Sequence, residues 1–368
     1  MSKTYRVGVI GSTGRGDYGH GVDISLLEVP RVSVVAVADD NPKGLKSASE
    51  RLKLDAAFAD YREMLDKTKP DIVAIGARWI DRHAEMATAA LSRGIHVYME
   101  KPLCRTLEEA DQILNACHMT HAKLALAHTT RYSPILSRVR ELIDGGAIGN
   151  VLEFRGRGKE DARGGAEDLW VLGSHILNLM VTLGGPAEWC FAKVKQNGTP
   201  IKKADVKPGN EGLGPLAGDD VRATYGLTRG STATFQSSRN GAGNPSRFAL
   251  QIYGTKGIIE IGNGYLPSAQ ILEDSSWSPG RSGIAWKNIS SAGVGQPEPL
   301  NNVSVNAGNV AAMNDLIDAI EQNREPLCSV QEARATIEMI LAVFESQRTG
   351  AVVAFPLNVK GNPLASLS

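Results

Sequence analysis

The feature that most constrains this chain is an alternation of short apolar runs with helical patterns over its first 128 residues. The apolar runs predict strands at Tyr5–Ile10, Val32–Ala38, Asp71–Ile75, His96–Met99 and Lys123–His128. The stretches between them include predicted helices at Pro42–Leu52, Asp81–Arg93 and Thr106–Thr120. Alternating β and α units build a parallel sheet that is buried on both faces. The pattern therefore predicts an N-terminal, doubly wound Rossmann sheet.

The pattern changes after about residue 130, where turns rather than helices join the apolar runs. Strands are predicted at Val151–Lys159, Trp189–Gln196, Val221–Leu227, Ser231–Ser238, Phe248–Tyr253 and Gly257–Ile261. Helices are predicted at Glu167–Leu183, Asn309–Gln322 and Val330–Thr349, and long loops at Asn197–Asp220 and Gly262–Asn302. Strands that follow one another through turns favour an open, mainly antiparallel sheet. We therefore expect an α/β chain with a Rossmann domain at 1–128 and an α+β domain at 129–368.

Composition excludes several classes of partner. The 368 residues carry 40 basic and 40 acidic side chains, so the basic surplus typical of nucleic-acid binding is absent. No apolar run reaches the ~20 residues that span a bilayer, and the N-terminus lacks a signal-peptide pattern. Four cysteines without a C-x-x-C pair and seven dispersed histidines predict no metal site. We expect a cytoplasmic protein with reduced thiols and no contact with membranes.

A glycine-rich turn follows the first predicted strand. Its residues, Gly11, Ser12, Thr13, Gly14, Arg15 and Gly16, are candidates for binding the phosphates of a dinucleotide. Glycines let backbone N–H groups approach a phosphate, and a following helix would add its positive end. The motif departs from G-x-G-x-x-G because Thr13 holds the middle position, which Gly14 would then replace. A plain glycine turn is the alternative.

An acidic residue ends the second predicted strand. Asp39 lies 23 residues after Gly16, where a carboxylate can accept hydrogen bonds from both ribose hydroxyls and repel a 2′-phosphate. This position favours NAD over NADP as the cofactor. The alternative role for Asp39 is a helix N-cap before Pro42, which Asp40 or Asn41 could also fill.

The segment His96-Val-Tyr-Met-Glu-Lys-Pro102 places Glu100 and Lys101 at the end of a predicted strand. Ligands of open α/β sheets bind beyond the carboxyl ends of the strands, so Lys101 is expected where cofactor and substrate meet. Burial and a cationic nicotinamide would favour the neutral amine, which can accept a proton from a substrate hydroxyl. The alternative is a surface lysine at the start of a loop.

Glu100-Lys101-Pro102, with Ile252–Ile258, Asn314–Glu321 and Glu345–Gly350 in the expected order, resembles the Gfo/Idh/MocA family of oxidoreductases. The resemblance implies NAD(P)-dependent dehydrogenation of sugars, cyclitols or their derivatives. It implies Lys101 as the catalytic lysine and a C-terminal sheet whose open face builds a homodimer or homotetramer. It also places Arg78, Trp79, His83 and Glu100 beside the cofactor, and Arg131 and Tyr132 beside the substrate.

The family's Asp-x-x-x-His pattern is altered here. His175 matches its histidine and is expected to act with Lys101, but Val171 occupies the aspartate position. On one continuous helix, Asp168, Val171, His175 and Asn178 would share a face. Asp168 would then contact the substrate, and Asn178 would orient His175. Packing inside a helix is the alternative for His175.

Two further segments depart from the family. Arg78 and Trp79 replace the usual Thr-Pro before His83, and Trp79 either walls the pocket or packs in a loop. The charged segment 156–170, with Lys159 as a candidate ligand, either binds a polyhydroxylated substrate or is a solvated loop.

Three hypotheses follow for function. The first is an NAD-dependent dehydrogenase acting on a secondary hydroxyl of a sugar, cyclitol or glycoside. The second is a glycoside hydrolase or lyase that oxidises its substrate transiently, eliminates a glycosidic group and returns the hydride to the sugar. The third is an NAD-binding regulator without activity, which the presence of Lys101 and His175 disfavours.

Overall fold

The computed structural model describes residues 3–301 and 303–367 and divides by contacts into two compact units. The first unit comprises the chain up to Tyr132 together with 210–214 and 304–334. The second comprises 133–209, 215–303 and the chain from 335 onward. The units interleave along the sequence, and the expected domain boundary at residue 128 stays a prediction.

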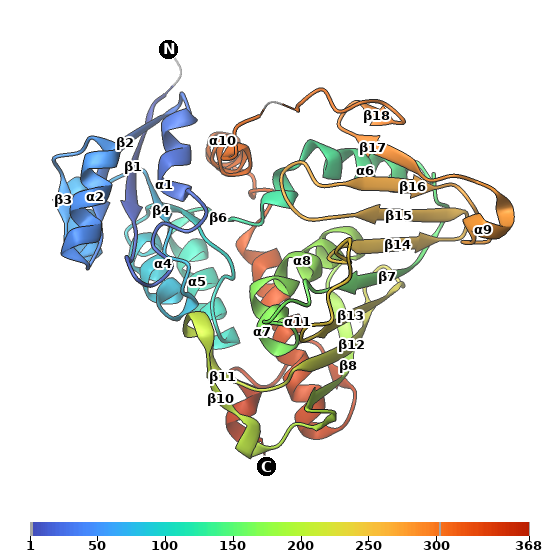
Figure 1. The fold of residues 1–368 in the computed structure, drawn as a ribbon. Coiled ribbons are helices and arrows are strands. Elements are labelled where there is room, and N and C mark those ends of the chain that lie inside the picture. Colours follow the sequence, from blue (N-terminus) through green and yellow to red (C-terminus); the bar gives the residue numbers. More distant parts are fainter. Residues whose placement is uncertain (1–2, 302, 368) are drawn as a thin grey trace. The chain divides into compact units, whose positions relative to one another are not determined.

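The described part of the first unit holds a six-stranded sheet with the order β3-β2-β1-β4-β5-β6 (Figure 1). Its strands are β1 (Tyr5–Ile10), β2 (Val32–Ala38), β3 (Ala57–Phe58), β4 (Ile72–Ile75), β5 (His96–Met99) and β6 (Leu124–Leu126). All five pairings are parallel. This order is that of the Rossmann fold, so the predicted N-terminal architecture is confirmed. The prediction missed β3, because two residues carry no periodicity, and it also missed the helix over Tyr61–Thr68.

Side chains that cap helix N-termini set several boundaries in the first unit. Asn41 begins α2 (Pro42–Leu52) by accepting hydrogen bonds from the backbone N–H groups of Lys43 and Gly44. Thr106 does the same for α5 (Leu107–Thr120). The other helices are α3 (Tyr61–Thr68), α4 (His83–Leu91) and α10 (Ala307–Glu321). The N-cap role considered for Asp39 therefore belongs to Asn41.

The prediction that a helix directly follows the glycine-rich turn is wrong. A loop, 17–21, separates Gly16 from α1 (Val22–Ser25), which continues only as a 3-10 turn over Leu26–Glu28. Gly19 and Gly21 have φ angles of 61° and 75°, and this left-handed backbone keeps the loop out of a helix. A helix this short adds little dipole, so anion binding would depend on the N–H groups of the loop.

The described part of the second unit contains an eleven-stranded sheet in the order β18-β17-β16-β15-β14-β7-β13-β12-β8-β19, with β9 paired to β8. The central strands are β7 (Val151–Arg157), β8 (Ala187–Gln196), β12 (Asp220–Leu227), β13 (Thr232–Ser238), β14 (Leu250–Gly254) and β15 (Gly257–Ile261). Only the β13–β7 pairing is parallel among the pairings described. The predicted, mainly antiparallel sheet is thus confirmed.

The two long loops predicted in this region contain short strands. The segment 262–302 holds β16 (Ala269–Leu272), β17 (Lys287–Ser290), β18 (Gly293–Val294) and the short helix α9 (Pro279–Ser282). The segment 197–220 holds β9 (Thr199–Pro200), β10 (Lys207–Gly209) and β11 (Gly214–Leu216). These strands are only two to four residues long and lie among Gly, Pro and Ser residues. Their alternation of apolar and polar side chains is therefore too short to predict a strand from the sequence.

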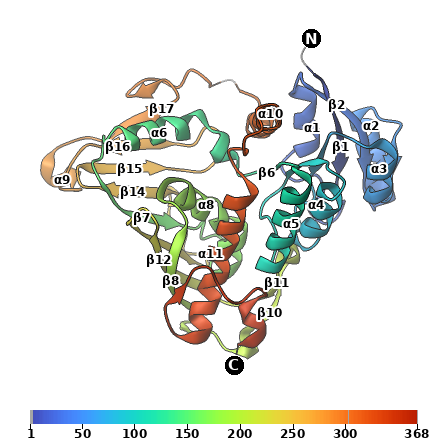
Figure 2. The same ribbon diagram turned by 180° about the vertical axis from the view of Figure 1, so that it is seen from behind.

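Helices cover one face of the large sheet (Figure 2). They are α7 (Ala166–Val171), α8 (Gly173–Gly184) and the part of α11 (Val330–Thr349) that belongs to the second unit. The hydroxyl of Tyr225 on β12 donates to the carbonyl of Met339 on α11 at 3.2 Å. Helix α6 (Pro134–Asp144) packs against β17, and β19 (Val353–Ala354) closes the far edge of the sheet. Within the described residues no helix has the length and apolarity that crossing a bilayer requires.

Candidate functional site

The glycine-rich turn folds into a compact loop at the carboxyl end of β1. The backbone N–H of Ser12 donates to the carbonyl of Asp17 at 3.0 Å, while Gly14 and Gly16 have φ angles of 86° and 85°. A Cβ atom on Gly16 would lie 2.4 Å from Cβ of Arg78, so the loop needs glycine at that position. Gly16 is therefore required by the close packing of this loop against Arg78.

Asp39 is buried and holds this loop to the end of β2. Its carboxylate accepts hydrogen bonds from the Thr13 hydroxyl at 2.7 Å, the Thr13 N–H at 3.2 Å and the Asn41 N–H at 2.9 Å. Thr13 thus stands in place of the middle glycine because its hydroxyl reaches this carboxylate. The binding of ribose hydroxyls by Asp39 stays a prediction.

A cavity of about 210 Å³ lies beyond the carboxyl ends of β1 and β2. Its lining includes Gly11, Asp39, Asp40, Tyr61, Arg62 and Arg82. Arg82 forms an ion pair with Asp40 at 2.7 Å, so one wall presents both a carboxylate and a guanidinium. Position and polarity fit the adenosine half of a dinucleotide, with the glycine-rich loop beside it for the phosphates.

Arg78 and Trp79 brace the loop. The guanidinium of Arg15 lies 5.0 Å from the centre of the Trp79 ring. The backbone N–H of Trp79 donates a hydrogen bond to the backbone carbonyl of Arg15 at 3.2 Å. Arg78 pairs with Glu211 of the segment 210–214 at 3.6 Å. Contact of either residue with a nicotinamide stays a prediction.

Glu100 and Lys101 follow β5 and are both buried, and the Lys101–Pro102 peptide is cis. Oε1 of Glu100 accepts hydrogen bonds from the His20 backbone N–H at 3.0 Å and from His20 Nδ1 at 2.8 Å. Oε2 accepts the backbone N–H of Lys101 at 3.2 Å. Burial by itself would raise the pKa of Glu100, but His20 and the Lys101 ammonium lower it to about 2. Glu100 is therefore a carboxylate at neutral pH.

His20 is a site residue that the sequence reasoning missed. It lies in the loop 17–21, beyond the glycine motif, and reaches Glu100 only because that loop bends back on left-handed glycines. A histidine four residues after Gly16 was the available signal. Without the fold, nothing connected that histidine to a glutamate 80 residues later.

His83 joins the turn after β4 to the loop of Lys101. Its Nδ1 lies 2.7 Å from the carbonyl of Pro102, and its Nε2 lies 2.7 Å from the carbonyl of Ala77. Burial lowers the pKa of this imidazole. His83 thus positions backbone in the first unit, and its predicted contact with cofactor stays a prediction.

Arg131 and Tyr132 are both engaged within the first unit. The Arg131 guanidinium pairs with Glu332 at 2.9 Å, and the Tyr132 hydroxyl donates to the carbonyl of Leu126 at 3.0 Å. Both side chains are buried. These contacts anchor the chain after β6, and substrate binding by this pair stays a prediction.

The second unit carries the remaining predicted residues. His175 is buried on α8, and Asn178 one turn later donates from Nδ2 to the Thr336 hydroxyl at 3.1 Å. Lys159 is exposed and lies 3.6 Å from Asp161. The orienting of His175 by Asn178 stays a prediction, as does the joint action of His175 with Lys101 of the first unit.

Asp168 does not share a helix face with His175, so this prediction is wrong. Leu172 interrupts the predicted helix, with φ −118° and ψ −40°, and separates α7 from α8. A Cβ atom on Gly173 would lie 2.6 Å from the Phe235 ring, so the chain approaches β13 too closely for another residue. Helical spacing therefore does not relate Asp168 to His175.

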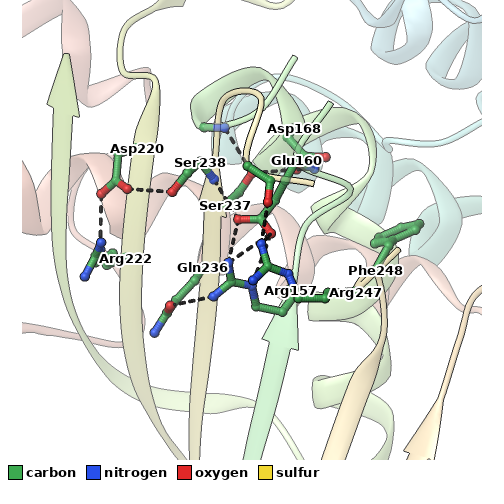
Figure 3. Close-up of polar contacts among 12 residues, drawn as sticks. Arg157, Glu160, Asp168, Asp220, Arg222, Gln236, Ser237, Ser238, Arg247 and Phe248 are labelled. Carbon is green, nitrogen blue, oxygen red and sulfur yellow. Dashed lines mark hydrogen bonds and ion pairs between the residues drawn. The ribbon is translucent and has the colours of Figure 1, made fainter. Parts of the chain in front are cut away.

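Asp168 instead stabilises the start of the charged segment (Figure 3). Its Oδ2 accepts the Ser237 hydroxyl at 2.5 Å and the Glu160 N–H at 3.0 Å. Its Oδ1 is buried without a hydrogen-bond partner among the described residues. Burial raises the pKa of this carboxyl. Substrate contact by Asp168 stays a prediction.

Two arginines neutralise the buried carboxylate of Glu160, as Figure 3 shows. Arg157 approaches Glu160 at 2.7 Å, and Arg247 approaches it at 3.3 Å. Arg157 also donates to Gln236 at 2.9 Å. These contacts fix much of the charged segment to β7 and β13, so it is not simply a solvated loop. In the described parts of the chain, no three His, Cys, Asp or Glu side chains gather as a metal site would need.

Comparisons with known proteins agree with this geometry. A model described as "Oxidoreductase family, NAD-binding Rossmann fold" matches residues 5–128, and one described as "GFO/IDH/MocA C-terminal domain" matches residues 136–260. Together the two models match well over half of the chain.

Individual relatives are more distant. The chain is 26% identical over 248 residues to a levoglucosan dehydrogenase of Pseudarthrobacter phenanthrenivorans, covering 61% of this chain and 63% of that one. It is 30% identical over 170 residues to a glycosyl hydrolase family 109 protein of Streptomyces niveus, covering 44% and 34%. The chain thus spans less than two thirds of the length of either relative. A solved levoglucosan dehydrogenase complex with NADH and levoglucosan superposes with a TM-score of 0.77 at 21% identity, covering 96% of this chain and all of that one.

Asp168 generates a prediction about the pH dependence of stability. A carboxyl with a raised pKa in the folded state binds its proton more tightly there than in the unfolded chain. Its contribution to stability is complete below the unfolded pKa of about 3.9 and is lost as pH rises through the folded pKa. Asp168→Asn keeps an oxygen for Ser237 and Glu160 and lacks this titration. We expect the stability of the variant relative to that of the wild type to increase as pH rises from 4 to 8.

Urea denaturation of both proteins across that pH range measures the difference. Asp144→Asn, at an exposed carboxylate of the same unit, is the matched control and should leave the slope of stability against pH unchanged. A constant stability difference between Asp168→Asn and the wild type at every pH would contradict the assignment.

Proposed function

Because the chain belongs to the GFO/IDH/MocA family of oxidoreductases, we propose that it is an NAD-dependent dehydrogenase of a sugar, cyclitol or glycoside. The observation that carries the proposal is the placement of Lys101. Its amine belongs to a buried residue beyond the carboxyl end of β5, where parallel sheets bind their ligands. The resemblance to a sugar dehydrogenase supports the substrate class.

Lys101 is proposed to accept the proton of the substrate hydroxyl. Bound NAD would take the hydride from the same carbon at its nicotinamide. Burial disfavours the charged ammonium form of an amine, and a neutral amine can act as a general base. The negative charge of Glu100 has the opposite effect on Lys101, because it favours the ammonium form. Once Lys101 has accepted the proton, the same charge stabilises the ammonium. In the second unit, His175 is proposed to contact the reacting oxygen, and the exposed Lys159 to bind substrate hydroxyls.

Replacing Lys101 tests the base. Lys101→Met keeps the length of the side chain and removes the amine, so we expect kcat to fall by about 10²–10⁴-fold. The affinity for NAD should change little, because the adenosine cavity lies at β1 and β2. NADH formation across a panel of sugars and cyclitols, with NAD binding by fluorescence, gives both numbers.

Lys46→Met, at an exposed lysine of α2, is the matched control and should retain full turnover. Turnover by Lys101→Met at the wild-type rate would remove Lys101 from the mechanism. A wild-type protein that forms no NADH with any member of the panel would argue against net oxidation.

We also propose that the enzyme prefers NAD over NADP. Asp39 and Asp40 place two carboxylates on the wall of the adenosine cavity, and a 2′-phosphate there would meet their charge. We expect NAD to bind at least about tenfold more tightly than NADP, a difference of about 1.4 kcal/mol. Asp40→Asn should narrow this ratio, because Arg82 would lose its anionic partner and become available to a phosphate. Titrations of wild type and variant with both cofactors measure the ratio, and equal affinities in the wild type would contradict the preference.

A second candidate function is redox-neutral cleavage of a glycoside. It is supported by the resemblance to a glycosyl hydrolase family 109 protein and by Val171 in place of the family's aspartate. Such an enzyme would release an aglycone without added cofactor and introduce solvent deuterium at C2 of the sugar. Mass spectrometry of the products formed from aryl glycosides in D₂O tests for both. Oxidised sugar with no deuterium at C2 would favour the dehydrogenase.

A further inference from the structure

Most backbone donors of the glycine-rich loop are used within the first unit itself. Their acceptors are the carbonyls of Ser12 and Asp17 and the carboxylates of Asp17 and Asp39. The N–H groups engaged in this way belong to Ser12, Thr13, Gly14, Arg15 and Asp17. Helix α1 is too short to offer the positive end that usually helps to bind a phosphate. The diphosphate of a dinucleotide therefore needs donors from side chains.

Arg78 lies directly against this loop and has an unused donor. A Cβ atom on Gly16 would lie 2.4 Å from Cβ of Arg78, and the N–H of the following residue, Trp79, donates to the carbonyl of Arg15. The Nε atom of Arg78 is buried without a hydrogen-bond partner among the described residues. The guanidinium faces the carboxylate of Glu211 at 3.6 Å, which is beyond hydrogen-bond distance. A guanidinium with donors to spare, beside a dinucleotide loop, matches the oxygens of a diphosphate.

Glu211 belongs to the segment 210–214, which packs against the same turn of the first unit. A Cβ atom on Gly212 would lie 2.8 Å from Oδ1 of Asp81, so the segment approaches this carboxylate closely. That oxygen is also buried without a hydrogen-bond partner among the described residues. The docked segment thus coexists with two unpaired buried atoms, Oδ1 of Asp81 and Nε of Arg78. Unpaired buried polar groups are costly, which favours displacement of the segment by a ligand that satisfies Arg78.

We propose that Arg78 binds the diphosphate of the nicotinamide dinucleotide and that Glu211 competes with the cofactor for this guanidinium. The proposal rests on the proposed function for the identity of the ligand. Two anions at one guanidinium repel each other, so binding of the diphosphate releases Glu211 and with it the segment 210–214. Arg15 is the other cation of the loop, but Asp81 already holds it in an ion pair. Arg78 is therefore the side chain on which binding of the diphosphate depends.

Calorimetric titrations with NAD, ADP-ribose and adenosine test the assignment of the diphosphate. Arg78→Met keeps the Cβ atom that packs on Gly16 and removes the guanidinium. We expect the affinities for NAD and ADP-ribose to fall by about tenfold or more, because a charge-assisted contact to both is lost. Adenosine has no phosphate and should bind equally well to both proteins. A loss for NAD alone would place Arg78 at the nicotinamide and overturn the assignment, as would unchanged affinities for NAD and ADP-ribose.

Arg93→Met, at an exposed arginine after α4, is the matched control and should bind all three compounds like the wild type. If Arg78→Met does not fold, Arg78→Gln removes the same charge and keeps the Cβ atom.

Glu211→Gln tests the competition. Without the carboxylate we expect NAD to bind about threefold more tightly, in keeping with an exposed ion pair. The gain should vanish when Arg78→Met is combined with Glu211→Gln, because Glu211 acts through that guanidinium. Glu108→Gln, at an exposed glutamate of α5, is the matched control and should leave the affinity unchanged. Unchanged or weaker binding of NAD by Glu211→Gln would overturn the competition.

Hydrogen exchange of the wild type gives a readout that needs no substitution. The amides of the segment 210–214 should exchange faster with NAD bound than without it, because the cofactor releases the segment. Slower exchange with NAD would show that the segment closes over the cofactor and would overturn the competition.

None of these measurements requires turnover. The expected changes in affinity, found in a protein that oxidises no polyol, would overturn the dehydrogenase and leave the role of Arg78 intact. An active dehydrogenase whose affinity for NAD and ADP-ribose is the same in Arg78→Met as in the wild type would overturn the role of Arg78 alone.

Discussion

The carboxylate of Glu100 is the interaction on which the candidate site depends. It lies where β5 ends and receives donors from two segments far apart in sequence, the loop 17–21 and the start of the Lys101 loop. A buried carboxylate without such donors would be costly, so the two segments and Glu100 stabilise one another. The same contacts give Lys101 a fixed anionic neighbour. The position of Lys101 and its electrostatic environment therefore have one physical origin.

A second buried carboxylate plays the corresponding part for the glycine-rich loop. Asp39 at the end of β2 binds both the hydroxyl and the N–H of Thr13 and so holds the loop at the switch point between β1, β2 and β4. Helix α1 is short and begins only at Val22, so it contributes little to positioning the glycine-rich loop. The carboxylate of Asp39 positions that loop instead. The loop 17–21 is thereby free to extend toward Glu100.

Buried acids also organise the charged segment of the second unit. Asp168 binds Ser237 and the backbone of Glu160, and Glu160 is enclosed by Arg157 and Arg247. Figure 3 shows these groups gathered at the ends of β7 and β13. Charges that suggested a solvated loop or a substrate site are largely satisfied by one another. A rigid support for α7 and α8, and hence for His175, is the consequence.

The order of most strands and helices, and the chemistry at the strand ends, could be predicted from the amino-acid pattern alone. Continuous apolar runs marked β1, β2, β4 and β5, and helical periodicity marked α2 and α5, because these signals are local. Asn41 was one of three candidates for the cap of α2. Glu100-Lys101 at the end of β5 was likewise readable, since a strand end in a parallel sheet faces the ligand crevice. Which distant groups meet could be seen only in the folded chain. His20 reaches Glu100, Thr13 reaches Asp39, and the approach of Gly173 to Phe235 breaks a helix that looked continuous. Each depends on a contact between segments that periodicity does not relate, because a side-chain pattern reports the face that a residue presents and not the partner that the fold brings to it.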